Sequence, residues 1–164
     1  MIVIMIVFSN TTPIIALSSI NQLNLLPTLF KEIYVVAEVV EECLEGGKII
    51  VPDLTQLSWI NVVQSLSTVL NPCLRELDKG ERHTINMAMH KNADYVIVDE
   101  KMGRNIAEYL GLSVIGTLGI LLKAKQQGKI ASFSTCVKAM QEQGIYYNTA
   151  LLKKLALQVG ENWL

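Results

Sequence analysis

The chain has few of the residues that build disulfide frameworks or zinc sites, with three cysteines and two histidines among 164 residues. Cys43, Cys73 and Cys136 are scattered, odd in number and not in CxxC spacing, so we expect reduced thiols in a cytoplasmic protein. Neither His83 nor His90 lies near a cysteine in the sequence, which leaves no zinc signature. Aromatic residues make up only 6% of the chain, too few to indicate a base-stacking platform.

Charge and hydrophobicity exclude further classes of protein. The formal net charge is -1, so a nucleic-acid partner would need metal ions or a local basic patch. With 51% hydrophobic and 18% charged residues, the composition is that of a globular chain. The apolar run at residues 2–8 is too short to span a bilayer and lacks signal-peptide features, so we expect no membrane segment. No linker rich in Pro, Gly or Ser divides the chain, which predicts a single domain over residues 1–164.

Short apolar runs alternate with helical patterns along most of the chain. Strands that are joined by helices form parallel sheets with helices on both faces, so we predict an α/β fold of this architecture. The expected strands lie at 2–8, 33–36, 59–63, 95–98 and 112–115. The expected helices lie at 13–17, 23–30, 38–44, 72–77, 80–91, 101–109, 118–127, 132–143 and 148–159.

The first predicted strand ends in a polar turn. In open α/β sheets ligands bind outside the carboxyl ends of the strands, so we expect Asn10, Thr11 and Thr12 to face any substrate. Thr12 also fits the N-cap of a helix whose first residue is Pro13. An alternative interpretation is that these polar residues serve only the turn and the cap.

Acidic and amide side chains follow several of the predicted elements. Asn10 and Asp99 each come directly after an apolar strand and should emerge at one edge of the sheet, where Glu42 and Glu81 could join them. Oxygen ligands without His or Cys suit Mg²⁺ or Mn²⁺, which serve in the cleavage of phosphodiester bonds. Each residue also has a structural interpretation: Glu81 suits the dipole of its helix, Asp99 suits a cap, and Glu41 with Glu42 suits a solvated helix face.

Four motifs give the chain a family resemblance. SNTTPIIAL at residues 9–17 resembles the S-D-T-S-P-L-I-A-L opening of a branch of the PIN-domain superfamily. LDKGE at 77–81 resembles the L-D-x-G-E of that branch, and VDEKMGR at 98–104 resembles its I-D-D-x-x-G-R. GTLGILLKAK at 116–125 is similar to its G-T-L-G-V-L-L-x-A-K. The four motifs come in the expected order and spacing over nearly the whole chain.

The resemblance implies a three-layer α/β/α fold with a mainly parallel sheet and a Mg²⁺- or Mn²⁺-dependent ribonuclease ancestry. Many similar proteins are toxins of VapC type, which are paired with a small antitoxin that blocks the site, and PIN-type toxins commonly form homodimers. The resemblance therefore implies an RNA substrate, a small antitoxin partner and a homodimer. A water activated by the metal would attack the RNA phosphodiester.

The same motifs assign site residues by resemblance. The first turn would support the site with Thr11 and Thr12. The implied metal ligands are Asn10, Glu81 and Asp99, and the implied catalytic residues are Asn10, Glu42, Glu81, Asp99 and Glu100. The placement of Glu42 is the least secure, because Glu38 and Glu41 lie within about one helical turn of it.

Basic residues follow two of the predicted strand ends and could attract phosphates to the site: Lys101, Arg104, Lys123, Lys125 and Lys129. An alternative interpretation is that these basic residues form an ordinary solvated helix surface. We single out Arg104 as a substrate contact, because the G-R pair places it just over one turn beyond Asp99. The last apolar positions, which are Leu151, Leu152, Leu155, Leu157, Val159 and Trp163, either pack on the core or form a dimer or antitoxin face.

The chain departs from the family pattern at two positions. Asn10 stands where the family has Asp, so the site loses a negative charge, and we expect weaker metal binding and still weaker catalysis. His83 stands where many relatives have a second Glu, and we interpret it first as a surface or core residue. Asn10 is either natural, introduced to disarm a toxin, or tolerated by a slow enzyme; the sequence leaves all three open.

Two other function classes compete with a nuclease. A catalytically inactive PIN-fold binding or regulatory protein would keep the fold and a partner without cleavage. A small-nucleotide-binding α/β protein is disfavoured, because the chain has no Gly-rich phosphate loop.

Overall fold

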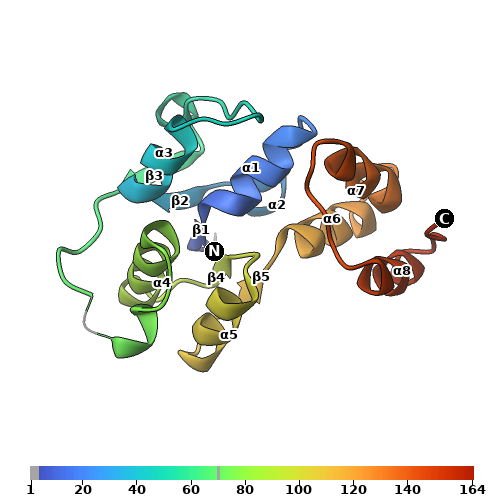
Figure 1. Cartoon of the computed structure of the whole chain (residues 1–164). Helices are drawn as coiled ribbons and strands as arrows, with labels where there is room; N and C mark the ends of the chain where they lie inside the picture. The colour runs from blue at the N-terminus through green and yellow to red at the C-terminus, as the bar shows by residue number, and fades with distance from the viewer. Residues whose placement is uncertain (1–3, 70) are drawn as a thin grey trace.

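A computed structural model describes residues 4–69 and 71–164. Its centre is a parallel sheet of five strands in the order β3-β2-β1-β4-β5, flanked by helices (Figure 1). The strands are β1 (Val7–Ser9), β2 (Ile33–Val36), β3 (Ile60–Val63), β4 (Tyr95–Ile97) and β5 (Val114–Ile115). The predicted α/β/α fold with a parallel sheet is confirmed.

The helices cover both faces of this sheet (Figure 1). They are α1 (Thr11–Ser19), α2 (Leu25–Phe30), α3 (Ala37–Leu44), α4 (Lys79–His90), α5 (Lys101–Tyr109), α6 (Thr117–Gln126), α7 (Phe133–Glu142) and α8 (Thr149–Gln158), with short 3-10 turns at Leu54–Gln56 and Pro72–Leu74. Helix α4 packs on β1, β2 and β4 and contacts α5, while α6 contacts α1 and α2. Helices α7 and α8 continue the packing outward from α6. None of the helices among the described residues has the length and apolarity that a bilayer crossing needs.

The three central strands, β2, β1 and β4, form the core because nearly all of their side chains are apolar and buried between the helical layers, whereas the edge strands β3 and β5 are partly exposed. Val7, Phe8 and Ile97 have no exposed surface, as expected for a parallel sheet between two helical layers. The register pairs Phe8 with Val96 and Ser9 with Ile97, so β1 and β4 end at the same level. The residues that follow these two strands therefore emerge side by side at the carboxyl edge of the sheet.

Three local predictions need correction. Helix α1 begins at Thr11 with Asn10 in the N-cap position, so the predicted Thr12 cap is wrong and Pro13 is the third helical residue. Proline is tolerated there because the first-turn N–H groups have no partner within the helix. The predicted helix 72–77 is only a 3-10 turn, and the first described strand begins at Val7, while residues 2 and 3 of the predicted strand lie outside the described residues.

The apolar end of the chain divides between core and surface. Leu152 is fully buried, whereas Leu151 and Leu157 expose 42% and 66% of their surface. Helix α8 thus packs one side on α7 and leaves apolar side chains in solvent.

Candidate active site

The end of β1 places a buried amide at the carboxyl edge of the sheet. The backbone N–H of Asn10 donates to the carbonyl of Ile97 over 3.0 Å, which extends the β1–β4 pairing by one residue. The Asn10 side chain is only 3% exposed, and its Oδ1 atom has no hydrogen-bond partner among the described residues. A buried oxygen without a partner costs free energy, about 1–3 kcal/mol, which a bound cation would offset.

Glu42 connects three helices at this edge. Its Oε2 atom accepts a hydrogen bond from the Thr11 hydroxyl over 2.5 Å, and its Oε1 atom accepts one from the Gly80 N–H over 3.0 Å. A Cβ atom on residue 80 would overlap the Glu42 carboxylate, so glycine is required for this approach. Glu41 is exposed on the far side of α3. Of these two neighbours, Glu42 is the one that α3 turns toward the first turn of α1.

Glu81 lies deepest among the predicted acids. Its residue is 4% exposed, and its Oε1 atom has no hydrogen-bond partner within the described part of the chain. Burial, followed by the charges of Asp78, Glu100 and Glu42, raises the pKa of Glu81 to about 7. Helix α5 comes close because residue 103 is glycine, where a Cβ atom would overlap the Glu81 carboxylate.

Asp99 is held by the start of α6. Its two oxygens accept hydrogen bonds from the Thr117 N–H over 2.7 Å and from the Thr117 hydroxyl over 2.6 Å. Burial raises the pKa of Asp99, while the bonds from Thr117 and the charge of Arg104 act in the opposite direction. Asp99 does not cap α5, since Glu100 occupies that position without a side-chain bond. The carboxylate is therefore fixed at the edge by a residue from another helix.

The remaining predicted residues differ in their exposure and in their contacts with this edge. Arg104 lies against the backbone of Gly116, where a Cβ atom would stand 2.5 Å from its Nη1 atom and 3.0 Å from Asp99 Oδ1. The two side chains thus share one small space. Glu100 is exposed but close enough for its charge to act on Glu81. Thr12 is exposed on α1, and no side-chain hydrogen bond of Thr12 is found among the described residues.

Two of the lysines that were expected near the site lie elsewhere. Lys123 sits over the aromatic rings of Phe30 and Tyr95, at 5.5 Å and 5.9 Å from their centroids. Lys125 pairs with Glu161 over 3.5 Å. Both are near the end of α6, whereas Asp99 binds its start, so these two lysines lie away from Asp99 and contact other parts of the chain. Lys101 and Lys129 are exposed.

A second buried acid was missed by the sequence reasoning. Glu38 is 7% exposed, and its Oε2 atom accepts a hydrogen bond from the Ser65 hydroxyl over 2.6 Å and lies 3.8 Å from His83 Nε2. His83 thus turns toward Glu38, in agreement with its interpretation as a surface or core residue. The signal that could have found Glu38 is its position in the first helical turn directly after a strand.

The donor atoms at this edge suit a hard divalent cation. Asn10 Oδ1 and Glu81 Oε1 are buried oxygens without partners, and oxygen ligands are those that Mg²⁺ and Mn²⁺ prefer. Within residues 4–69 and 71–164, no three His, Cys, Asp or Glu side chains come together closely enough to hold a metal ion. Asparagine is not one of those four residue types, so this finding does not take account of Asn10. The carboxylates of Asp99 and Glu42 accept hydrogen bonds from Thr117 and Gly80.

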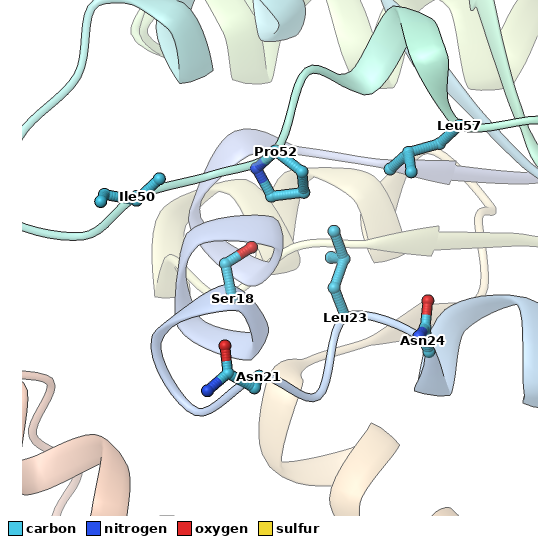
Figure 2. A pocket seen from close by; sticks show the side chains of 7 residues that line it. All are labelled: Ser18, Asn21, Leu23, Asn24, Ile50, Pro52 and Leu57. Atoms are coloured by element: carbon cyan, nitrogen blue, oxygen red, sulfur yellow. The ribbon is translucent and has the colours of Figure 1, made fainter.

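Among the described residues, α1 lines a larger and a smaller pocket. The larger, of about 280 Å³, lies at the end of the helix between Ser18, Leu23 and Pro52, and none of the predicted site residues lines it (Figure 2). The smaller, of about 140 Å³, is lined by Glu42 and by Ile15 on α1. The smaller pocket is therefore the one that adjoins the acidic edge.

Comparison with known proteins identifies the family. The family model DUF3368, described as a PIN domain, matches residues 5–161. No curated protein and no solved structure matches the chain at a significant level. Since the match spans nearly the whole sequence, the chain belongs to the DUF3368 family of PIN domains.

Proposed function

We propose that this chain is a single-domain, cytoplasmic PIN endoribonuclease of the VapC type, the toxin of a toxin-antitoxin pair, with activity reduced by Asn10. Membership of a PIN family suggests a nuclease-like function and an RNA substrate, and the four motifs of the sequence support the more specific assignment.

The observation that carries the proposal is a pair of buried oxygens, on Asn10 and Glu81, that have no hydrogen-bond partner among the described residues. They belong to the edge of the sheet where Asp99 also lies. Asn10, Glu81 and Asp99 would hold Mg²⁺ or Mn²⁺, and Glu42 and Glu100 would add negative charge. When bound, the ion would supply an activated water for attack on an RNA phosphodiester.

The side chains of the site have separable tasks in this proposal. Thr117 fixes Asp99, and Glu42 fixes the first turn of α1 against α4. Arg104, beside Asp99, would contact a phosphate oxygen. Glu81 must be deprotonated to act as a ligand, so its pKa of about 7 predicts that ion binding strengthens as the pH rises toward and above 7.

Asn10 would be the weak point of the site. An amide offers an oxygen but no charge, and a unit charge at 4 Å from a unit charge contributes about 4 kcal/mol at an effective dielectric constant near 20. The loss of such an attraction would weaken ion binding and, with it, cleavage. The amide at position 10 also favours a second candidate function, that of a PIN-fold binding or regulatory protein that no longer cleaves.

The proposed partners are a small antitoxin and a second copy of the chain. Helix α8 supports this part of the proposal, because Leu151 and Leu157 leave apolar surface exposed on one helix. Size-exclusion chromatography with light scattering would report a dimer if this surface pairs two copies.

Cleavage of a mixed-sequence RNA pool with Mn²⁺ tests the proposal. We would compare the chain as given with Asn10→Asp, and use Asn10→Asp combined with Asp99→Asn as the control. The proposal predicts strong cleavage by Asn10→Asp, little or none by the chain as given, and none by the control. If Asn10→Asp neither cuts RNA nor binds metal, the acids are structural and the binding-protein candidate replaces the nuclease.

A further inference from the structure

A small pocket opens beside the acidic edge, between α1, the end of α3 and the segment 46–51. Its volume is about 140 Å³. Glu42 and Lys48 are the two charged side chains of a lining that is otherwise apolar. The lining residues include Ile15, Glu42, Gly46, Gly47, Lys48 and Ile49.

The pocket is continuous with the candidate active site through Glu42. The Glu42 carboxylate binds Thr11 at the first turn of α1, and Ile15 lies one turn further along the same face of that helix. Ile15 thus lies about 6 Å along α1 from Thr11, and Glu42 lines the pocket itself. An RNA strand with a phosphodiester at the acidic edge would bring a neighbouring base to this opening.

The lining suits a flat, neutral ring system. Ile15 and Ile49 offer apolar surface for the faces of a base, and Gly46 and Gly47 bring backbone without side chains to the wall. A Cβ atom on Gly47 would meet no other atom within 4 Å, so there is open space at this point. Unpaired RNA bases can be splayed out of a strand and bound singly, with polar groups of the protein at their edges.

Charge also favours a nucleotide here. Lys48 is exposed at the pocket and provides a cation for the phosphate that accompanies a base. The larger pocket, at the C-terminal end of α1, offers Asn21, Asn24 and Ser18 but no basic or acidic side chain (Figure 2). The smaller pocket therefore combines cation, apolar walls and access to the acidic edge.

We propose that this pocket is a subsite for one unpaired base of the RNA strand, adjacent to the phosphodiester that lies at the acidic edge. The inference rests on the proposed nuclease function and adds Ile15, Gly47, Lys48 and Ile49 as substrate-contacting residues that set base preference.

Photo-crosslinking of single-stranded RNA tests the subsite without requiring cleavage. The RNA would carry 4-thiouridine at random positions, and crosslinked peptides of the chain as given would be mapped by mass spectrometry. Two variants address the pocket: Gly47→Leu places a bulky side chain at its wall, and Lys48→Ala removes its cation. Matched controls are Gln56→Leu, which adds the same side chain outside the pocket, and Lys91→Ala, which removes an exposed lysine at the far end of α4.

The subsite predicts crosslinks within residues 46–51 that fall about tenfold in Gly47→Leu, which corresponds to a loss of about 1.4 kcal/mol in binding free energy, and less in Lys48→Ala. Both controls should stay within about twofold of the parent chain. In the Asn10→Asp background, Gly47→Leu should change the preferred base beside the cut.

Three outcomes would overturn the subsite. Crosslinks that fall only elsewhere contradict it, whether or not Asn10→Asp cleaves. Cleavage by Asn10→Asp with unchanged base preference in Gly47→Leu contradicts it while leaving the proposed function intact. Protection of residues 46–51 by a co-expressed protein partner, without crosslinks to RNA there, would assign the pocket to that partner instead.

Discussion

Replacing Glu81 by glutamine should make the metal-free protein more stable at neutral and alkaline pH. Glu81 is 4% exposed, and burial together with the charges of Asp78, Glu100 and Glu42 raises its pKa to about 7. The buried charge is thus unfavourable unless a cation shares the site. The Glu81→Gln substitution would keep the shape of the side chain and remove the charge.

The magnitude follows from the pKa shift. Because the folded-state pKa is raised above the ordinary value of 4.5, the proton on Glu81 stabilises the fold fully below pH 4.5, and this contribution is lost as the pH rises through 7. At about 1.36 kcal/mol per pKa unit, the shift sets an upper limit of about 3 kcal/mol. We expect about 1–2 kcal/mol, because the exposed Glu100 charge is screened by solvent.

Urea unfolding in EDTA, followed by circular dichroism between about pH 4 and pH 8, measures this difference. Glu81→Gln should match the parent near pH 4 and exceed it by about 1–2 kcal/mol near pH 8. The control is Glu108→Gln, an exposed acid on α5, which should change stability by less than about 0.5 kcal/mol at either pH. A Glu81→Gln protein that is no more stable than the parent at pH 8, or whose advantage is the same at both pH values, would refute the reasoning.

Two further changes test other contacts. Gly103→Ala should cost about 1–3 kcal/mol in urea unfolding, because its Cβ overlaps the Glu81 carboxylate. In a Glu81→Ala background the cost should fall to the smaller part that comes from the 3.1 Å approach to Val98 Cγ1; an equal cost in both backgrounds would contradict the Glu81 contact. Glu161 accepts hydrogen bonds from the N–H groups of Phe133 and Ser134 and from the Ser132 hydroxyl. Burial acts to raise the pKa of Glu161, but these bonds outweigh it and lower the pKa to about 2. Its stabilisation is therefore present above pH 4.5 and lost as the pH falls toward 2, so Glu161→Gln should cost about 1 kcal/mol at pH 7 and less at pH 3.

The layout of strands and helices could be predicted because each element carries its own pattern. Buried parallel strands give unbroken apolar runs, as at Tyr95–Ile97, and helices show apolar spacing followed by glycine or asparagine. What no local pattern contains is which strands lie side by side. That β1 and β4 are direct neighbours, which brings Asn10 level with the end of β4, comes from the tertiary fold.

The sequence predicts which residue types gather at the candidate site and at which edge of the sheet they lie. It does not predict which oxygens have hydrogen-bond partners, because the partners come from distant segments: Thr117 for Asp99, and Gly80 for Glu42. Glycines that make room for carboxylates, such as Gly103, show no sign of that role in sequence. Lys123 was misplaced for a related reason, since a helix that starts at the site carries its later residues to the opposite edge.

We propose that Asn10, Glu81 and Asp99 form a divalent-cation site that lacks one charge. Calorimetric titration with Mn²⁺ at about pH 8 would compare the parent chain, Asn10→Asp, and Asn10→Asp combined with Glu81→Gln. We expect binding at least about tenfold tighter in Asn10→Asp than in the parent, and loss of that gain in the double variant. Equal Mn²⁺ affinity in the parent and Asn10→Asp, or affinity that survives the removal of the Glu81 charge, would contradict it.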